Sequence, residues 1–136
     1  MYSMKKPKNQ LPYSLELTQR CTASYMLALN DTLNVLQGKW KMPVMGALSV
    51  GKKRFSEIER EIPGINPRML SKELRELEVN GMVNRTVYDS FPVTIEYSLT
   101  PTGISFKRVL DVMVEWGIEH RTAVLAQNAR RKKSAA

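Results

Sequence analysis

The chain is poor in the residues from which metal sites and catalytic triads are usually built. Its 136 residues include one cysteine, Cys21, and one histidine, His120. A single cysteine excludes an intramolecular disulfide framework and a zinc site made of several cysteines. A single histidine argues against a histidine metal centre or a serine–histidine–aspartate triad. We therefore expect no metal, no cofactor and no catalytic residue, and we do not expect an enzyme.

Long apolar runs are also missing. No run reaches the roughly 20 residues of a membrane-spanning helix, and the N-terminus lacks the apolar stretch of a signal peptide. The sequence therefore predicts a soluble, cytoplasmic protein with no membrane partner. The 21 basic residues outnumber the 13 acidic ones, which gives a net charge of +8. This excess favours a polyanionic partner, although charge alone does not separate DNA from RNA or an acidic membrane.

The clearest pattern in the chain is an amphipathic helix between Ile65 and Gly81. Asn66 can cap the free amides of the first turn, and Pro67 suits the first helical position. Gly81 is a typical residue to follow a helix end. At about 100° per residue, two faces separate: an apolar one with Leu70, Leu74 and Leu77, and a cationic one with Arg68, Ser71, Lys72 and Arg75. Taken alone, the cationic face could equally be a solvated surface.

Two more helices are predicted upstream of residues 51–54. Apolar residues recur at intervals of three and four from Thr22 to Gln37, which predicts a first helix. A second helix should begin near Lys41, because Pro43 is tolerated only in a first turn. Trp40 is expected to be a core anchor at their junction.

A short helix should immediately precede the cationic one. Residues 51–54 are interpreted as a basic turn, and Ser56 is expected to cap a helix over residues 57–62, with Glu59 completing a capping box. The Pro63-Gly64 pair then forces a sharp turn. Two helices joined in this way, the second of them basic, are typical of a helix-turn-helix.

After Gly81 the apolar period falls to about two. Residues 82–88 and 93–99 are predicted to be strands that form a hairpin around a turn at residues 89–92. A hairpin directly after a helix-turn-helix is a wing. The fold class is therefore expected to be mainly α with a small β-hairpin wing, a winged helix-turn-helix.

The last predicted helix carries more apolar surface than one small core can cover. Thr100 and Pro101 begin it, and it is expected to end near residue 126. One stripe can pack on the domain itself, so the surplus predicts a homodimer formed by the N- and C-terminal helices. The interface residues would be Tyr25, Met26, Leu29, Leu33, Val109, Val112, Met113 and Trp116. The alternative is a well-wrapped core helix in a monomer.

The chain is thus divided into three parts by the sequence. Residues 1–20 are expected to form a flexible arm, residues 21–126 the winged helix-turn-helix domain with its dimerisation helices, and residues 127–136 a disordered basic tail.

A set of short motifs resembles one known family. In order, they are Gly38-Lys-Trp40, Arg54-Phe-Ser-Glu57, Pro63-Gly-Ile65, Arg68-Met-Leu-Ser71, Leu74-Arg-Glu-Leu77, Asn80-Gly81, and Glu96-Tyr-Ser-Leu-Thr100 followed by Gly103. Together they resemble the HxlR-type winged helix-turn-helix regulators of prokaryotes over about residues 21–118. The resemblance implies a dimeric, cytoplasmic, DNA-binding transcription factor that acts as a repressor or an activator.

The chain departs from that family in two places. The family commonly has a Cys-Pro pair near its first helix, whereas Cys21 is followed here by Thr22. Its wing also tends to carry a basic residue just before the Glu-Tyr-Ser-Leu-Thr run. Residues 93–95 are Val-Thr-Ile here, which leaves Arg85 as the best basic candidate in the wing.

The expected partner is double-stranded DNA, bound as an inverted-repeat operator with half-site centres about 10 bp apart or a multiple of one turn. Arg68 and Arg75 have the fork geometry for guanine or for phosphate. The full predicted set is Ser56, Asn66, Pro67, Arg68, Ser71, Lys72 and Arg75 in the helix-turn-helix, Lys52, Lys53 and Arg54 in the basic turn, and Arg85, Thr86, Tyr88 and Ser90 in the wing.

Two kinds of signal stay open at this stage. Cys21 lies beside Arg20 and before a helix, where its thiolate could be stabilised for redox or electrophile sensing; the alternative is a passive buried thiol. Tyr25, Met26 and Trp116 could line a pocket for a small-molecule effector, or could simply be core.

Two other classes compete with the regulator. A winged-helix module that binds protein or RNA would also show a basic face, merely solvated. An enzyme would need a nucleophile–base pair or a metal cluster, and the clustered carboxylates Glu57, Glu59 and Glu61 are better explained as helix surface and cap.

Overall fold

The structure is a computed structural model that describes residues 22–135. The chain separates into two units, one ending at Gln37 and one beginning at Gly38, and each is described by itself. The predicted arm at residues 1–20 and Cys21 lie outside the described residues.

The described part of the first unit is helix α2, Thr22–Val35. The predicted first helix is therefore confirmed. Among its predicted interface residues, Met26, Leu29 and Leu33 are exposed and Tyr25 is half-buried.

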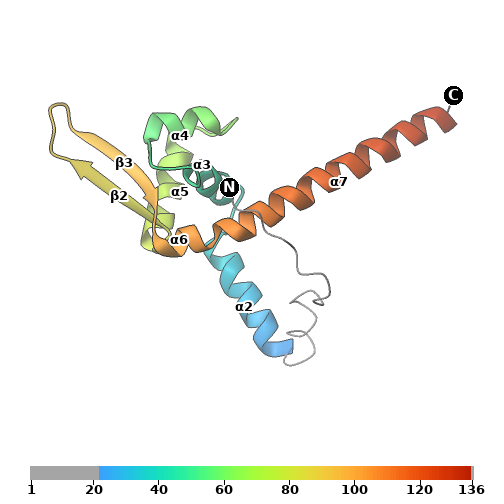
Figure 1. The fold of residues 1–136 in the computed structure, drawn as a ribbon, viewed down its shortest axis with the longest axis horizontal. Coiled ribbons are helices and arrows are strands. Elements are labelled where there is room, and N and C mark those ends of the chain that lie inside the picture. The colour runs from blue at the N-terminus through green and yellow to red at the C-terminus, as the bar shows by residue number, and fades with distance from the viewer. Residues whose placement is uncertain (1–21, 136) are drawn as a thin grey trace. The chain divides into compact units, whose positions relative to one another are not determined.

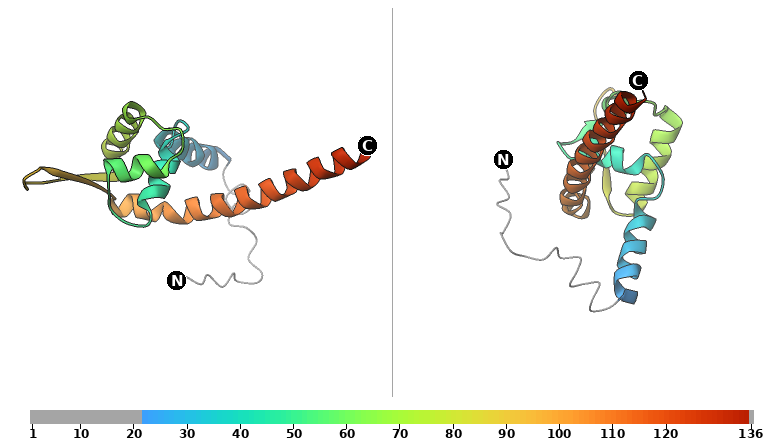
Figure 2. Two further views of the ribbon diagram at one scale, coloured as in Figure 1. Left: turned by 90° about the horizontal axis from the view of Figure 1, so that it is seen from above. Right: turned by 90° about the vertical axis from the view of Figure 1, so that its right-hand side faces the viewer.

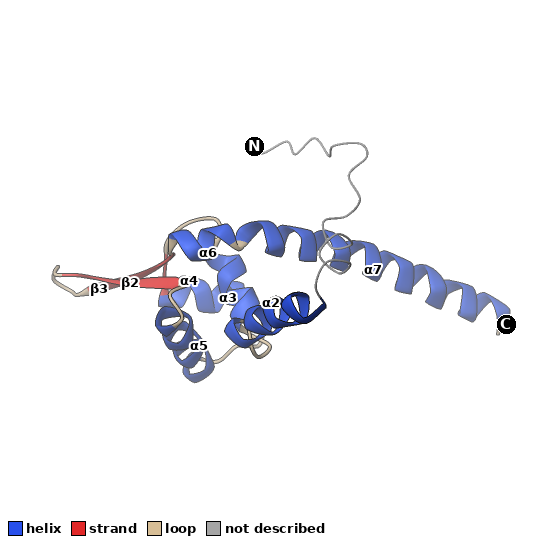
Figure 3. Ribbon diagram, turned by 90° about the horizontal axis from the view of Figure 1, so that it is seen from below, coloured by secondary structure: helices blue, strands red, loops and turns tan. Residues whose placement is uncertain are grey.

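The second unit is a winged helix, as the sequence predicted (Figure 1). Its elements, in order, are α3 (Lys41–Leu48), β1 (Lys53–Arg54), α4 (Phe55–Glu61), α5 (Pro67–Val79), β2 (Val83–Tyr88), β3 (Thr94–Leu99), α6 (Pro101–Ser105) and α7 (Lys107–Ser134). Helices α3, α4 and α5 form the helical body, and β2 and β3 form a hairpin that projects from it (Figure 3).

The core of this unit lies where α3, α4 and α5 meet the base of the hairpin. Its fully buried side chains are Val44, Met45, Ile58, Leu70, Leu74, Leu77 and Val83. Those of α5, Leu70, Leu74 and Leu77, are spaced by three or four, so one face of this helix is removed from water. Trp40, expected to be a core anchor, is only half-buried, and the ammonium of Lys39 lies 4.6 Å from its ring centroid.

Helix α4 begins two residues earlier than predicted. Its N-cap is Arg54, whose backbone N–H donates to Oε1 of Glu57 at 3.4 Å. Ser56 therefore lies inside the first turn and does not cap the helix, and Glu59 does not close a capping box. The sequence pattern favoured Ser56 because serine is a common N-cap, but here the third helical residue is Glu57.

The sheet has three strands in the order β1-β3-β2, all antiparallel. The hairpin strands match the predicted ones to within a residue. Strand β1 was not predicted, because residues 51–54 were interpreted as a turn. It is only two residues long, and it pairs Lys53 with Tyr97 and Arg54 with Glu96. Two residues show no periodicity, so nothing in the sequence could reveal this strand.

The start of α6 is held closely against the end of α5. The Oγ1 of Thr100 accepts from the backbone N–H of Gly103 at 3.0 Å and donates to the carbonyl oxygen of Gly81 at 2.6 Å. The backbone N–H of Thr100 donates to the carbonyl oxygen of Met82 at 3.0 Å. A Cβ on Gly103 would lie 2.3 Å from that same oxygen, so only glycine fits.

Helix α7 continues further than predicted. The expected end was near residue 126, with a disordered tail beyond it, but the helix runs through Ser134 (Figure 2). The basic residues Arg131, Lys132 and Lys133 occupy its last turn, where positive charge is favourable to the helix dipole. The charge run that was interpreted as a disordered tail is thus part of the helix.

Candidate nucleic-acid interface

Helix α5 has the boundaries that its sequence predicts. The Oδ1 of Asn66 accepts from the backbone N–H of Met69 at 2.8 Å, and Pro67 occupies the first helical position. At the other end Gly81 has a φ of +72°, which favours glycine, and the backbone N–H of Met82 returns to the carbonyl oxygen of Leu77 at 2.9 Å. Both ends are therefore fixed locally.

The two faces of α5 are separated as predicted. Leu70, Leu74 and Leu77 are at most 1% exposed. The residues of the basic face, Arg68, Ser71, Lys72 and Arg75, are all exposed. Because the leucine face is packed into the core, the helix can present this basic face to a partner without any rearrangement.

Glu73, a charged residue in the middle of α5, is buried. It is 6% exposed, and its Oε2 accepts from the Nζ of Lys41, itself 4% exposed, at 2.7 Å. The same ammonium donates to Glu76. Lys41, on α3, thus holds two carboxylates of α5. The sequence could not reveal this ion pair, because its partners are 32 residues apart and lie on different helices.

The charges in this cluster stabilise one another. Burial alone would lower the pKa of Lys41, but hydrogen bonds to Glu73 and Glu76, and their charges, hold that pKa above its ordinary value of 10.5. The hydrogen bond from Lys41 also holds the pKa of Glu76 below its ordinary value of 4.5. Near neutral pH Lys41 and Glu76 are therefore both charged.

The predicted basic turn is less available than its sequence suggests. Lys53 forms an ion pair with Glu61, and its side chain is only 12% exposed. Lys52 lies 3.4 Å from Oε2 of Glu96, whose hydrogen bond and charge raise the pKa of this lysine. Arg54 and Ser56 are exposed. Two of the three predicted basic contacts are therefore already paired within the protein.

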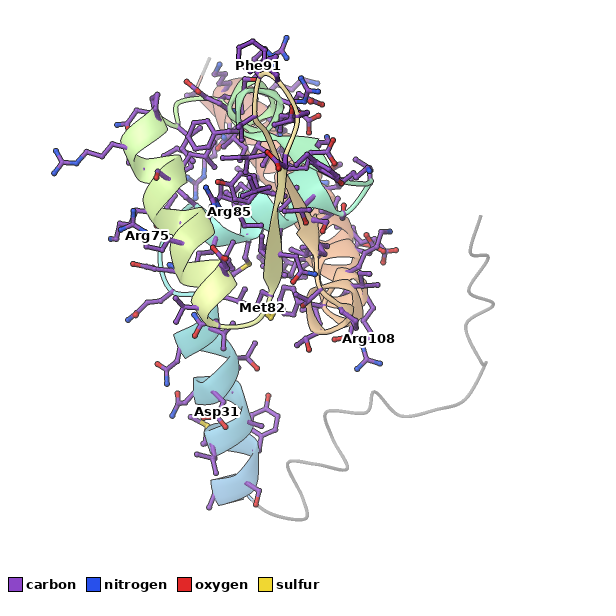
Figure 4. The ribbon with its side chains drawn as sticks, turned by 90° about the vertical axis from the view of Figure 1, so that its left-hand side faces the viewer. Asp31, Arg75, Met82, Arg85, Phe91 and Arg108 are labelled. Carbon is purple, nitrogen blue, oxygen red and sulfur yellow. The ribbon has the colours of Figure 1, made fainter. Side chains whose placement is uncertain are left out.

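The predicted wing residues fall on opposite faces of the hairpin. Side chains alternate along a strand, so Arg85 shares the face of buried Val83, whereas Thr86 and Tyr88 share the other. Figure 4 shows Arg85 on the side of the hairpin next to α5, the helix that carries Arg75. The structure therefore brings Arg85, but not Thr86 and Tyr88, towards the basic face of α5. Ser90 lies in the turn, where its Oγ donates to the carbonyl oxygen of Pro92 at 2.8 Å.

Helix α7 exposes the apolar stripe on which the predicted dimer depends. Leu110 is its one buried residue. Val109, Val112, Met113, Trp116 and Val124 share one face of the helix at its period of 3.6 residues, and they are 38% to 64% exposed. Val114, Ile118 and Leu125 lie towards the opposite side and are also exposed. The ring of Trp116 stacks on His120, with centroids 4.8 Å apart. The alternative of a well-wrapped core helix is therefore wrong for this unit.

Other kinds of site were sought among residues 22–135. No group of three or more metal-binding side chains is found there, and no helix in that range is long and apolar enough to cross a membrane. An open depression of about 320 Å³ is lined by Trp40, Pro43, Gly46, Ala47, Glu61, Ile62 and Pro63. It shares no residue with the effector pocket suggested by Tyr25, Met26 and Trp116.

A helix-turn-helix with an exposed basic second helix, followed by an antiparallel wing, defines a winged-helix transcriptional regulator. A family model described as HxlR-like helix-turn-helix matches residues 35–124. The chain belongs to this HxlR-like family, as its motifs suggested.

Similar proteins are regulators too. The chain is 43% identical over 96 residues to the uncharacterised HTH-type transcriptional regulator YtcD of Bacillus subtilis (strain 168), a match that covers 71% of this chain and 76% of that protein. It is 36% identical over 129 residues to YdeP of the same organism, also an uncharacterised HTH-type transcriptional regulator, with 95% and 96% covered. The structure of the redox regulator HypR in its reduced form has a TM-score of 0.68 at 41% identity, covering 73% of this chain and 98% of that one.

Proposed function

We propose that the protein binds double-stranded DNA sequence-specifically, as a homodimer, and so represses or activates transcription at an inverted-repeat operator. The observation that carries this proposal is the basic face of α5, where Arg68, Ser71, Lys72 and Arg75 are all exposed on a helix whose opposite side is the core. In a helix-turn-helix the second helix enters the major groove and its N-terminal half reaches the base edges. Arg68 and Ser71 belong to that half.

The other predicted DNA contacts are assigned according to whether each side chain is exposed or already paired with a carboxylate. Arg54 and Arg85 flank α5, are exposed, and are proposed to bind phosphates. Asn66 and Pro67 would place the first-turn amides near the backbone, and Ser56 would approach a phosphate from the first turn of α4. Lys52 and Lys53 contribute less, because each already has a carboxylate partner.

Dimerisation is proposed to occur through α7. Its exposed apolar face includes Val109, Val112, Met113 and Trp116, and burying that face against a second copy would remove its surface from water. Met26, Leu29 and Leu33 of α2 are also exposed, and we propose that they too take part in dimerisation. A two-fold dimer presents two copies of α5, so its operator should be an inverted repeat.

A redox signal is proposed to act through Cys21. Support comes from the likeness to HypR, described as a redox regulator, and from Arg20 beside the cysteine in sequence. Replacing Cys21 with serine should abolish any change in DNA affinity on treatment with an oxidant. An oxidant response that persists in this variant would dismiss the thiol.

The test of the whole proposal is selection of bound duplexes from a random pool. We expect an inverted repeat with half-site centres about 10 bp apart or a multiple of one turn. Affinity for it should fall steeply with salt concentration. A module that binds protein or RNA would select no duplex, and a single half-site would contradict the dimer.

A further inference from the structure

The hairpin ends in an apolar tip, defined here as residues 89–93. Phe91 is fully exposed, and Val93 is 62% exposed. Figure 4 shows Phe91 at the far end of the hairpin from Met82. Beyond Val83 every residue of β2 is exposed, so the tip stands well away from the core. An aromatic ring held in water at the end of a projecting hairpin is available to a partner.

The length of the hairpin determines what the tip can reach. Arg85 lies beside α5, strand β2 continues for three residues to Tyr88, which corresponds to roughly 10 Å at 3.3 Å per residue, and Phe91 lies in the turn beyond that point. A turn of duplex DNA is roughly 35 Å long, so the minor groove lies roughly 17 Å along the axis from the major groove. With α5 in the major groove, the tip therefore extends towards the adjacent minor groove.

The chemistry of the tip does not favour a phosphate contact. It contains no lysine or arginine, and its one charged residue is Asp89, which phosphate repels. What it offers is the edge and face of an aromatic ring, followed by Pro92 and Val93. Minor-groove proteins insert such apolar side chains between adjacent base pairs, which partly unstacks the step and bends the duplex.

We infer that Phe91 is an apolar wedge that enters the minor groove flanking each half-site and bends the operator there. This inference rests on the proposed function and adds a second kind of recognition to it. Pyrimidine–purine steps such as TA and CA unstack most easily, so the wedge would select them about half a turn outside the position of α5. Specificity at that step would come from DNA deformability and not from hydrogen bonds to bases.

The test compares three variants on the selected operator. Phe91→Ala removes the ring, Phe91→Leu keeps an apolar wedge, and Val50→Ala removes an apolar side chain that is 79% exposed outside the tip. The side chains of Phe91 and Val50 both lie in solvent, so the fold should be unaffected. Affinity is measured by gel retardation, bending by phased gel assays, and unstacking by 2-aminopurine fluorescence at the flanking step.

We expect Phe91→Ala to lose roughly 10-fold in operator affinity, most of the bend and the 2-aminopurine signal, because unstacking needs the ring. Phe91→Leu should keep a large part of all three, and Val50→Ala should match the wild type. Phe91→Ala should also leave the salt dependence unchanged, whereas Arg85→Ala should reduce its slope by about one.

Three results for Phe91→Ala would contradict the wedge. The first is an unchanged bend, and the second is a loss of affinity without a loss of unstacking. The third is an altered dimer mass in sedimentation, which would place the ring against a second copy of the protein. Each presupposes a wild-type protein that binds an operator. A wild type that binds no duplex would instead refute the proposed function, so the two failures are distinguishable.

Discussion

The Nζ of Lys41 lies 2.7 Å from the Oε2 of Glu73, and both side chains are buried. Lys41 is in the first turn of α3, and Glu73 is in the middle of α5, on the side opposite its basic face. The pair therefore connects the core directly to the helix proposed to read DNA. Since a buried charge is costly unless it is paired, removing either partner alone should destabilise the packing of α3 against α5.

Replacing Lys41 with methionine should destabilise the protein by about 3–5 kcal/mol, because it leaves the carboxylate of Glu73 buried without its partner. Chemical denaturation of the two proteins measures the difference. The matched control is the double variant Lys41→Met, Glu73→Leu, which removes both charges and should recover much of the loss. A single variant as stable as the wild type would show that Glu73 is not effectively buried.

The same cluster predicts how stability depends on pH. The pKa of Glu76 is lowered by its hydrogen bond to Lys41, so its contribution is present above the ordinary carboxyl pKa of 4.5 and is lost as the pH falls through the lowered value. The pKa of Lys41 is raised, so its contribution is present below 10.5 and is lost as the pH rises beyond that. Glu76→Gln should therefore be less stable than the wild type near neutral pH, and the difference should shrink in acid. A difference that stays constant down to the acid transition would contradict the assignment.

Gly103→Ala should destabilise the protein by about 1–3 kcal/mol, because the new methyl would lie 2.3 Å from the carbonyl oxygen of Met82 and 3.2 Å from the Cβ of Leu99. The control is Gly46→Ala in α3, where nothing lies within 4 Å of the added Cβ. In that helix alanine should be neutral or stabilising by up to about 1 kcal/mol. Thermal unfolding of both variants separates the close contact from helix propensity.

Arg68→Ala should cost about 1–3 kcal/mol of discrimination at one base pair in each half-site, if the guanidinium pairs with a guanine. Binding to a panel of operator variants measures this directly. Lys72→Ala is a suitable comparison, because a lysine that contacts phosphate should weaken binding to every sequence equally. If Arg68→Ala weakened binding to every sequence equally, this arginine would be assigned to a phosphate of the DNA backbone.

Glutamates in place of Val112 and Trp116 should convert the dimer to a monomer and lower operator affinity. Both side chains are more than 60% exposed, so the charges cost the single chain little but would be buried in a dimer. Analytical ultracentrifugation gives the mass. Val50→Glu, at a comparably exposed position outside α7, should stay dimeric. A double variant that remains a dimer would place the interface elsewhere.

The features that the sequence predicted well are those set by local chemistry. Asn66, Pro67 and Gly81 determine the ends of α5 through contacts within a few residues, and its leucines are correctly placed inside. The hairpin was recognisable because two runs alternate around a turn. These signals are short in range and repeat, so a single sequence is enough to find them.

What the sequence could not predict depends on contacts between distant segments or on competing local choices. The burial of Glu73 requires Lys41 from another helix, and helical periodicity alone places a charged residue outside. Strand β1 exists because β3 lies beside it. The pairing of Lys53 with Glu61 makes less available a lysine that charge counting had included in the predicted interface.

The close contact between Gly103 and Met82 has a mechanical consequence. Thr100, the N-cap of α6, donates hydrogen bonds to the carbonyl oxygens of Gly81 and Met82, which follow α5. Helix α7 starts two residues after α6 ends. These hydrogen bonds hold the end of α5, the helix proposed to enter DNA, directly against the start of the segment that leads into α7, the helix proposed to join the two copies. A change in the crossing angle of two α7 helices would therefore tilt each α5 with it. The half-site spacing that the dimer prefers would then depend on how the two α7 helices pack.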